Sequence, residues 1–417
     1  MKILYLNPDR GIPVLGAKGA SVHVREFVTA LAEQGHEVVL VCATAGDGNV
    51  PPPGQLIEVA PENDETQLAR ECIARGLPAS AMEDRVMRRE LLRLAYDRHL
   101  CERVRVALEK NDFRPDVIYE RYALFHRAGA TLAQVLGIPR FLEVNAPLIQ
   151  EEEQFRGLTL KPAARAAEQA SFRRADGIVA VSAEVAAYVA STGVPGGKIQ
   201  TLPNGVDTAR FRPDADGAAV RAKLGFDSDP VIGFIGSFKP WHGTGFLIDA
   251  FGAMAMMHPR IRLLCIGEGP ELEAARQGIA AHKLTGRATF TGRIPHAEIP
   301  AHLAAMDLSV APYLPSRDFY FSPLKVVESL AAGIPVIASR IGQLEHLIDD
   351  NHTGFLFTPG SGAEFAIKTL KLVRDPARRR AMGKAARERA LSEFGWDKVV
   401  GHVTLKIRHE IDEKRAT

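Results

Sequence analysis

Short apolar runs alternate with amphipathic stretches along the first half of the chain. A run at 2–7 (KILYLN) is followed by a stretch with helical spacing (SVHVREFVTALAEQG) and by a second run, EVVLVCA. This order predicts a strand, a helix and a second strand parallel to the first. Further buried strands of the same parallel sheet are predicted at 116–120, 139–145 and 177–182.

The same alternation returns in the second half. Its apolar runs lie at 231–236, 262–267, 288–292, 307–312, 334–339 and 354–359, and its helical patterns at 243–257 and 270–281. Between the halves, residues 204–230 crowd Gly, Pro and Asp together, which is typical of an interdomain linker. The 417 residues also exceed the size of a single hydrophobic core. We therefore predict an α/β protein of two Rossmann-like domains, at 1–205 and 206–392.

A long helical insertion is predicted in the N-terminal domain, at about residues 64–110. Its apolar residues Met87, Leu91, Leu94 and Ala95 recur at helical spacing. Since the charges of the insertion roughly cancel, the favoured interpretation is a helix that packs on the N-terminal domain. The alternative is a surface for a membrane or a lipid acceptor.

Composition and charge favour a small-molecule ligand. Lys plus Arg number 52 and Asp plus Glu number 50, so no electrostatic signal indicates nucleic acid as a partner. The four cysteines (Cys42, Cys72, Cys101 and Cys265) have neither metal-binding nor disulfide spacing. No run resembles a signal peptide or a membrane-spanning helix. The sequence predicts a cytoplasmic protein, with peripheral contact to the inner face of a membrane left open.

The segment SPLKVVESLAAG at 322–333 carries the most informative chemistry. Ser322 and Pro323 predict a helix start, as N-cap and first helical residue. The unpaired amides of that first turn make a phosphate site, and Lys325 adds a cation. Glu328 lies about 5 Å further along the same face, where a carboxylate can accept hydrogen bonds from ribose hydroxyls. The alternative is a plain ion pair between Lys325 and Glu328.

Five motifs follow one another in a characteristic order. They are NGVDTARFRP, GSFKPWHG, IGEGPEL, TGRIP and SPLKVVESLAAGIPVIAS. Together they resemble the glycosyltransferases of family 4, which have the GT-B architecture of two Rossmann-like domains facing across a cleft. The resemblance runs over nearly the whole chain. At 393–417 the chain resembles the family's closing helix, which crosses back to the N-terminal domain.

The resemblance implies a reaction and its partners. A sugar is transferred, with retention of anomeric configuration, from a nucleotide-diphosphate sugar that binds mainly to the C-terminal domain. No metal or other cofactor is implied. The acceptor stays open between a carbohydrate, a lipid-linked molecule and a small molecule.

The resemblance and the helix start together predict the donor-binding residues. They are Gly16, Gly236, Ser237, Lys239, Arg293, Ile294, Tyr320, Ser322, Leu324, Lys325 and Glu328. Ser237 and His242 stand where the family carries an arginine and a lysine on the diphosphate. Lys239 is therefore favoured as a diphosphate ligand, over an exposed loop lysine. The family's first glutamate, which contacts the transferred sugar, is also absent, and Tyr320 or Asp318 can substitute for it.

In the N-terminal domain the resemblance draws attention to the strand end at 139–145. Asn145 stands where family members often place an active-site histidine, and its amide can form hydrogen bonds but cannot become cationic. Glu143 shares that strand face, as an active-site carboxylate or as the partner of an arginine. The residues predicted to act in catalysis are Asn145, Glu143, Lys239 and Lys325. Those predicted on the acceptor side are Gly19, His23 and His126, each with a structural role as the alternative.

Two Asp-x-Asp triplets stand in the linker, Asp214 with Asp216 and Asp227 with Asp229. In another glycosyltransferase architecture such carboxylates hold a metal ion on the diphosphate. Here they lie among Pro and Gly of a polar connector, where Asp favours turns. We therefore predict no metal site.

The predicted function is that of a retaining glycosyltransferase in the synthesis of polysaccharides, glycolipids or cell-surface glycans. Two alternatives stay open. One is a nucleotide-sugar epimerase, which needs no acceptor. The other is a non-catalytic subunit that binds a nucleotide sugar without turning it over.

Overall fold

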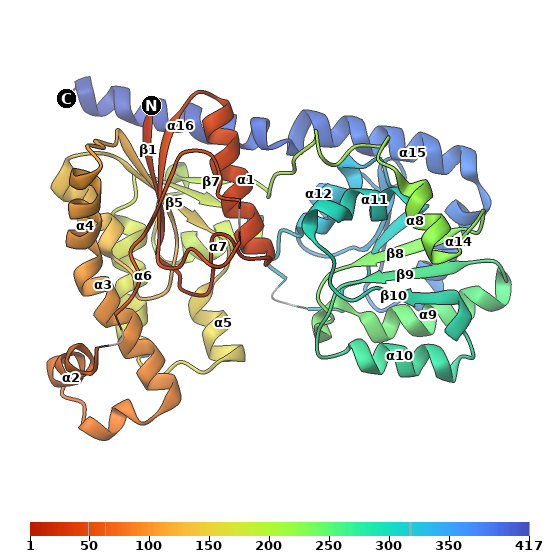
Figure 1. Cartoon of the computed structure of the whole chain (residues 1–417), viewed down its shortest axis with the longest axis horizontal. Helices are drawn as coiled ribbons and strands as arrows, with labels where there is room; N and C mark the ends of the chain where they lie inside the picture. The colour runs from red at the N-terminus through yellow and green to blue at the C-terminus, as the bar shows by residue number, and fades with distance from the viewer. Residues whose placement is uncertain (49, 63, 317–318, 417) are drawn as a thin grey trace. The chain divides into compact units, whose positions relative to one another are not determined.

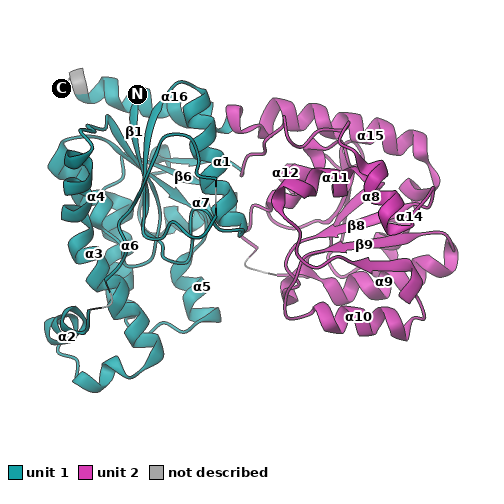
Figure 2. Ribbon diagram, in the orientation of Figure 1, with its two compact units in different colours: residues 1–203, 399–417 teal, residues 204–398 magenta. Residues whose placement is uncertain are grey.

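The predicted alternation of strands and helices gives two separate parallel sheets, one in each half of the chain (Figure 1). The computed structural model describes residues 1–48, 50–62, 64–316 and 319–416. Unit 1 comprises Met1–Pro203 and the residues from Val399 onward, and unit 2 comprises Asn204–Lys398 (Figure 2, teal and magenta).

The described part of unit 1 holds a seven-stranded sheet in the order β3-β2-β1-β4-β5-β6-β7. Its strands are β1 (Lys2–Asn7), β2 (Glu37–Cys42), β3 (Gln55–Glu58), β4 (Val117–Arg121), β5 (Arg140–Val144), β6 (Gly177–Ala180) and β7 (Ile199–Thr201). Its helices are α1 (Gly19–Glu33), α2 (Glu65–Ala74), α3 (Arg85–Lys110), α4 (Ala128–Leu136), α5 (Leu148–Phe155), α6 (Lys161–Arg173), α7 (Ala183–Ser191) and most of α16 (Trp396–Ala416). All residues of β6 are buried, as expected of a parallel sheet covered on both faces.

The described part of unit 2 holds a six-stranded sheet in the order β10-β9-β8-β11-β12-β13. Its strands are β8 (Val231–Ile235), β9 (Arg262–Ile266), β10 (Ala288–Phe290), β11 (Leu308–Ala311), β12 (Val336–Ser339) and β13 (Gly354–Phe357). Its helices are α8 (Gly217–Leu224), α9 (Thr244–Met257), α10 (Leu272–Ala281), α11 (Ile299–Ala304), α12 (Leu324–Ala331), α13 (Leu344–Leu347), α14 (Gly362–Arg374) and α15 (Pro376–Arg389). Leu263 and its neighbour Leu264 enter different core clusters, because successive side chains of β9 point to opposite faces.

These sheets confirm the predicted α/β class with two Rossmann-like domains. In each sheet the strand order reverses beside the first strand, between β1 and β4 and between β8 and β11. Rossmann-like folds bind ligands at the carboxyl ends of the strands next to such a reversal. The edge strands β3 and β7 escaped the sequence analysis because their side chains are only partly buried and form no apolar run.

The segment predicted as the closing helix, 393–417, is divided between the two units. Its residues up to Lys398 belong to unit 2, and unit 1 resumes at Val399. The backbone amide of Val206 donates to the carbonyl of Phe394 at 2.8 Å, and the amide of Trp396 donates back to Val206 at 3.1 Å. These bonds fasten the first residues of the segment to unit 2.

Within the insertion, helix α3 packs on the sheet of unit 1. Leu91, Leu94 and Ala95 are buried, and Met87 is half-buried. The carboxylate of Asp97 also accepts the amides of Arg127 and Ala128 at 2.7 and 2.8 Å, and so caps the start of α4. None of the described helices is long and apolar enough to cross a membrane.

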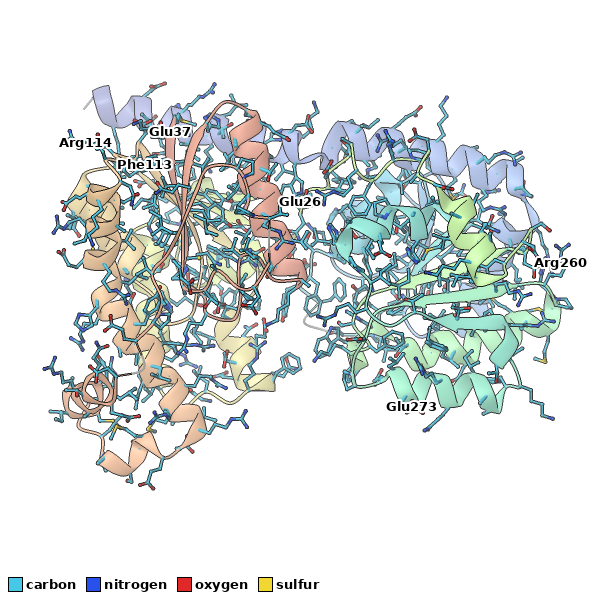
Figure 3. All side chains as sticks on the ribbon, in the orientation of Figure 1. Glu26, Glu37, Phe113, Arg114, Arg260 and Glu273 are labelled. Atoms are coloured by element: carbon cyan, nitrogen blue, oxygen red, sulfur yellow. The ribbon has the colours of Figure 1, made fainter. Side chains whose placement is uncertain are left out.

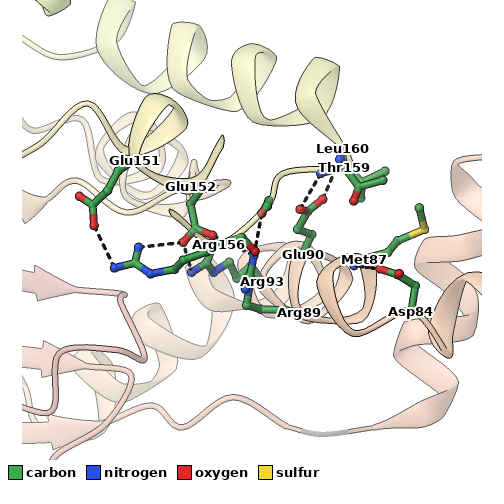
Figure 4. A network of polar contacts seen from close by, with 11 residues as sticks. Asp84, Met87, Arg89, Glu90, Arg93, Glu151, Glu152, Arg156, Thr159 and Leu160 are labelled. Atoms are coloured by element: carbon green, nitrogen blue, oxygen red, sulfur yellow. Dashed lines mark hydrogen bonds and ion pairs between the residues drawn. The ribbon is translucent and has the colours of Figure 1, made fainter. Parts of the chain in front are cut away.

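A polar network ties α3 to α5 (Figure 4). The buried carboxylate of Glu152 accepts from Arg89 at 2.9 Å and from Arg93 at 3.0 Å. The equally buried Glu90 accepts the backbone amides of Thr159 and Leu160 at 2.8 and 2.7 Å. Because both oxygens of each carboxylate accept hydrogen bonds within unit 1, we assign the network a structural role.

One aspartate of each Asp-x-Asp triplet, Asp216 and Asp229, has a structural partner. Asp216 caps α8 through the amide of Ala219 at 3.3 Å. Asp229 accepts from Arg260, labelled in Figure 3, and from Arg262, both at 2.8 Å. Ion pairs of this kind, as well as turns, account for aspartates in this segment. Across the described ranges, no three His, Cys, Asp or Glu side chains are grouped so that they could hold a metal ion.

Candidate active site

The helix of the most informative motif, α12, begins at Leu324, one residue later than expected. Pro323 is its N-cap and supplies no capping hydrogen bond, so the prediction of Ser322 as N-cap is wrong. Ser322 is engaged elsewhere: its Oγ accepts the amide of Asn204 at 3.0 Å, and its carbonyl accepts from Asn204 Nδ2 at 2.6 Å. The first-turn amides of α12 are left without a side-chain cap, the arrangement that suits an anion.

The ammonium of Lys325 is buried, and no hydrogen-bond partner reaches it from the described residues. Its Nζ lies 4.6 Å from the ring centroid of Phe234 and 4.8 Å from that of Tyr313. Burial lowers the pKa of Lys325 to about 7. The predicted alternative, an ion pair with Glu328, is absent, because Glu328 pairs with His296 instead. A buried ammonium that none of the described residues pairs with suits an anionic ligand.

Two glycines follow β8 and β9 directly, and the first brings backbone close to this ammonium. A Cβ on Gly236 would lie 3.2 Å from Lys325 Nζ. A Cβ on Gly267, whose φ is +130°, would lie 2.0 Å from the carbonyl oxygen of Gly236. No side chain fits between these turns, so the backbone itself lines the space beside Lys325.

The residues at the family's two cationic positions carry no charge that could replace them. Burial, aided by the positive charge of Lys325, lowers the pKa of His242 to about 3, so its imidazole is neutral at pH 7. The ring nitrogen Nδ1 hydrogen-bonds the carbonyl of Ser237. Lys239 is exposed, with its Nζ 5.9 Å from the ring centroid of Trp241. Lys325 and Lys239 are therefore the cations that this segment and α12 provide.

The remaining predicted donor residues of unit 2 lie in several environments. Arg293 is exposed, and its Nε lies 3.7 Å from a carboxylate oxygen of Glu268. Ile294 packs against the core, and Leu324 is half-buried. Tyr320 is buried, with its ring centroid 4.4 Å from that of Phe321. Asp318 lies outside the described residues.

In unit 1, the carboxylate of Glu143 is surrounded by polar partners. Its Oε1 lies 2.6 Å from His23 Nε2 and 3.0 Å from Arg121 Nη1, and it also accepts from Asn145 Nδ2. Burial by itself would raise the pKa of Glu143, but the charges and hydrogen bonds of these neighbours outweigh burial and lower it to about 2. Of the two interpretations left open, the arginine partner is present. His23, an acceptor-side candidate, joins the same cluster.

Replacing Glu143 with glutamine is expected to lower the free energy of unfolding at pH 7 by about 3 kcal/mol, because Arg121 would stay buried without its counter-charge. Since folding lowers the pKa of Glu143 from 4.5 to about 2, its stabilising contribution is complete above pH 4.5 and is lost as pH falls toward 2. Urea unfolding at pH 7, 5 and 3.5 measures the difference in the free energy of unfolding between the wild type and Glu143→Gln, which should shrink at the lowest pH. The exposed Glu33→Gln is the matched control, and a difference independent of pH would contradict the assignment.

The other predicted residues of unit 1 make contacts within that unit. Gly16 lies where a Cβ would be 2.9 Å from Pro13 Cγ, and its carbonyl accepts from Arg25 at 2.7 Å. Gly19 is the first residue of α1. His126 is buried, and its Nδ1 lies 2.8 Å from the carbonyl oxygen of Leu124.

Two residues of these clusters escaped the sequence analysis. Arg121 stands directly opposite Glu143 in the register of β4 and β5, a pairing that needs the strand order. His296 follows the TGRIP motif, and its Nε2 lies 2.8 Å from Glu328 Oε1. A single histidine in a turn carries no signal of its partner. Strand order and tertiary packing bring both residues to their sites.

Comparison with known proteins identifies the class. A model described as Glycosyltransferase Family 4 matches residues 17–210, and one described as Glycosyl transferases group 1 matches residues 229–375. With its two Rossmann-like units, the chain is a glycosyltransferase of GT-B architecture. It belongs with the family 4-like enzymes, which confirms the resemblance seen in the sequence.

Individual relatives agree with this class. The chain is 26% identical over 411 residues to a glycogen synthase of Mycobacterium tuberculosis, covering 96% of this chain and 92% of that protein. It is 31% identical over 244 residues to a GDP-mannose-dependent alpha-(1-6)-phosphatidylinositol monomannoside mannosyltransferase of Mycolicibacterium smegmatis, covering 58% of this chain and 64% of the relative. The fold matches that of Anabaena HepE, solved in complex with UDP, with a TM-score of 0.72 at 19% identity over 98% of this chain and 100% of that one.

Proposed function

We propose that this glycosyltransferase takes its sugar from a nucleotide-diphosphate sugar and transfers it with retention to an acceptor hydroxyl, in the synthesis of polysaccharides, glycolipids or cell-surface glycans. The observation that carries the proposal is the buried, unpartnered ammonium of Lys325 at the start of α12. The UDP bound to HepE and the GDP-mannose dependence of the mannosyltransferase support a donor of this class.

The donor diphosphate lies, in this proposal, against the first turn of α12. The amides there and Lys325 stabilise the charge of the leaving diphosphate, and Lys239 adds an exposed cation. Glu328 accepts the ribose hydroxyls about 5 Å further along the helix. Arg293 and Ile294 face the base. Tyr320 and the backbone near it contact the transferred sugar.

In unit 1, Asn145 forms hydrogen bonds to donor or acceptor, and His23, His126 and Gly19 lie on the acceptor side. Because Glu143 already binds His23, Arg121 and Asn145, its role is to hold Asn145 rather than to take a proton. No protein nucleophile is assigned. The leaving diphosphate itself helps to deprotonate the acceptor hydroxyl.

The reaction is proposed to need no metal ion, since protein cations and amides neutralise the diphosphate. Treatment with EDTA is therefore expected to leave the transfer rate unchanged within about twofold, whereas loss of a charge-stabilising group costs ~10²-fold or more. Initial rates before and after chelation, and after adding Mg²⁺ or Mn²⁺, measure this. A rate that collapses with EDTA and returns with Mg²⁺ would contradict it.

The proposed function is tested by saturation-transfer NMR against UDP-, GDP-, ADP- and dTDP-sugars, followed by a search for acceptors with the donor that binds. Transfer with a retained anomeric configuration is the expected result. Conversion of the donor sugar without an acceptor would show an epimerase. Binding of the donor without turnover by any acceptor would show a binding subunit.

Glu328→Ala is expected to weaken binding of the donor by about 1 to 3 kcal/mol, because a charged hydrogen-bond partner of the ribose is lost. Calorimetry with the nucleoside diphosphate of the donor measures the change. Glu345→Ala offers an exposed glutamate elsewhere in unit 2 as the control. Unchanged affinity of Glu328→Ala would remove the ribose assignment.

A further inference from the structure

The carboxylate of Glu328 is held by one neighbour and open on its other oxygen. His296 Nε2 lies 2.8 Å from Glu328 Oε1. Glu328 is 7% exposed, so its carboxylate is buried apart from a small opening. Among the described residues, no donor reaches Oε2. One oxygen is therefore committed within the protein, and the other is available to a ligand.

Arg210 sets the direction of the hydrogen bonds at the imidazole. Its Nη1 lies 3.3 Å from His296 Nδ1. A guanidinium can only donate, so Nδ1 must be the acceptor and carries no proton. The other ring nitrogen, Nε2, then donates its N–H to Glu328. Arg210 is in turn held by Asp207, with Nη2 3.3 Å from Oδ2. The hydrogen bonds run in one direction, from Arg210 through His296 to Glu328.

Packing holds the imidazole and the helix of Glu328 together. The ring of His296 lies 5.5 Å from that of the buried Phe211. Arg387 donates from Nη1 to the carbonyl of Phe211 and to that of Ala331, the last residue of α12, both at 2.7 Å. The guanidinium of Arg387 thus links Phe211, which packs against His296, to the helix that contains Glu328.

We propose that His296 is a positioning residue, which orients Glu328 toward the ribose and makes the site select ribose over 2′-deoxyribose. The inference rests on the proposed role of Glu328. With Oε1 held by His296, Oε2 is presented at a fixed angle to the ribose hydroxyls. Without that hydrogen bond the carboxylate rotates, and the energetic advantage of the second hydroxyl falls.

The test compares, by calorimetry, the affinity for UDP with that for 2′-deoxyuridine diphosphate, and for GDP with that for 2′-deoxyguanosine diphosphate. The proteins are the wild type, His296→Phe, which keeps a ring but no donor, and His296→Gln, whose side-chain amide replaces Nε2–H. We expect the wild type and His296→Gln to favour the ribose form about tenfold, the scale of a hydrogen bond to a charged group. In His296→Phe the preference falls to about threefold or less.

Two controls separate the possible failures. Inorganic pyrophosphate lacks ribose, and its affinity should be the same in all three proteins. If it falls in His296→Phe, the effect is a general disturbance and the inference is overturned. Should His296→Phe fail to fold, His296→Asn, which is too short to reach Oε1, takes its place.

Glu328→Ala distinguishes the inference from the proposed function. If Glu328→Ala loses the preference for ribose and His296→Phe keeps it, the inference is wrong and the ribose assignment stands. If the preference survives in Glu328→Ala, or if the wild type shows no preference for ribose, the ribose assignment within the proposed function falls and the inference with it.

Discussion

Replacing Lys325 with methionine is expected to lower the transfer rate by about 10²- to 10³-fold, the usual cost of removing one group that stabilises a developing charge. The same change is expected to raise the free energy of unfolding at pH 7 by about 1 to 3 kcal/mol, because an unpartnered polar group no longer has to be buried. Loss of activity combined with gain of stability is the signature of a residue kept for its ligand.

The gain in stability has a defined pH dependence. Burial lowers the pKa of Lys325 from 10.5 to about 7, so as pH falls through this window the unfolded chain takes up the proton first. The wild type therefore loses stability relative to Lys325→Met between pH 10.5 and 7. Urea unfolding at pH 7 and 9.5 measures the change.

Lys371 offers a matched control for the lysine substitution, as an exposed lysine with its Nζ 5.6 Å from the ring centroid of Phe355. Lys371→Met should change neither rate nor pH dependence. A wild-type transfer rate in Lys325→Met would show that Lys325 does not stabilise the leaving diphosphate.

Gly267→Ala is expected to lower the free energy of unfolding by about 2 to 4 kcal/mol. The added methyl would lie 2.0 Å from the carbonyl oxygen of Gly236, and alanine disfavours the φ of +130°. To relieve this clash, Gly236 must shift, and Gly236 lies beside Lys325. The shift changes the backbone that lines the proposed diphosphate site, so the affinity for the donor should fall as well. Urea unfolding and calorimetry with UDP measure the two effects.

Gly245→Ala is the control for the glycine substitution, since a Cβ at Gly245 in α9 meets nothing within 4 Å. There, alanine should be neutral or stabilise by up to ~1 kcal/mol. Equal stabilities of Gly267→Ala and Gly245→Ala would show that the turns after β8 and β9 have room to separate.

The fold was predictable because burial on both faces makes most central strands rich in apolar residues, as in β1 and β8. The motif order then supplied the glycosyltransferase class, and the phosphate-type helix start pointed to α12. Side-chain partners were a different matter. Whether Ser322 capped the helix depended on Asn204, which lies 118 positions away in the chain. The local sequence favoured Ser322 as the N-cap, but in the folded chain its hydroxyl accepts the amide of Asn204 instead.

The polar clusters show the same limit. Two-residue periodicity placed Glu143 and Asn145 on one face, and left open whether the carboxylate was catalytic or paired. Only the order of β4 and β5 brings Arg121 opposite Glu143. Likewise, spacing put Lys325 and Glu328 on one helix face, but their separate surroundings, aromatic rings for one and His296 for the other, come from packing.

The cap that Asp97 places on α4 has a consequence for anyone who builds hybrids of these enzymes. The region at 64–110 is tempting to exchange between relatives as a cassette, because it looks like an addition to the sheet. Yet the backbone amides of Arg127 and Ala128 would lose their acceptor if the exchanged region had no residue equivalent to Asp97. A transplant of this region must therefore carry α3 and α4 as one piece.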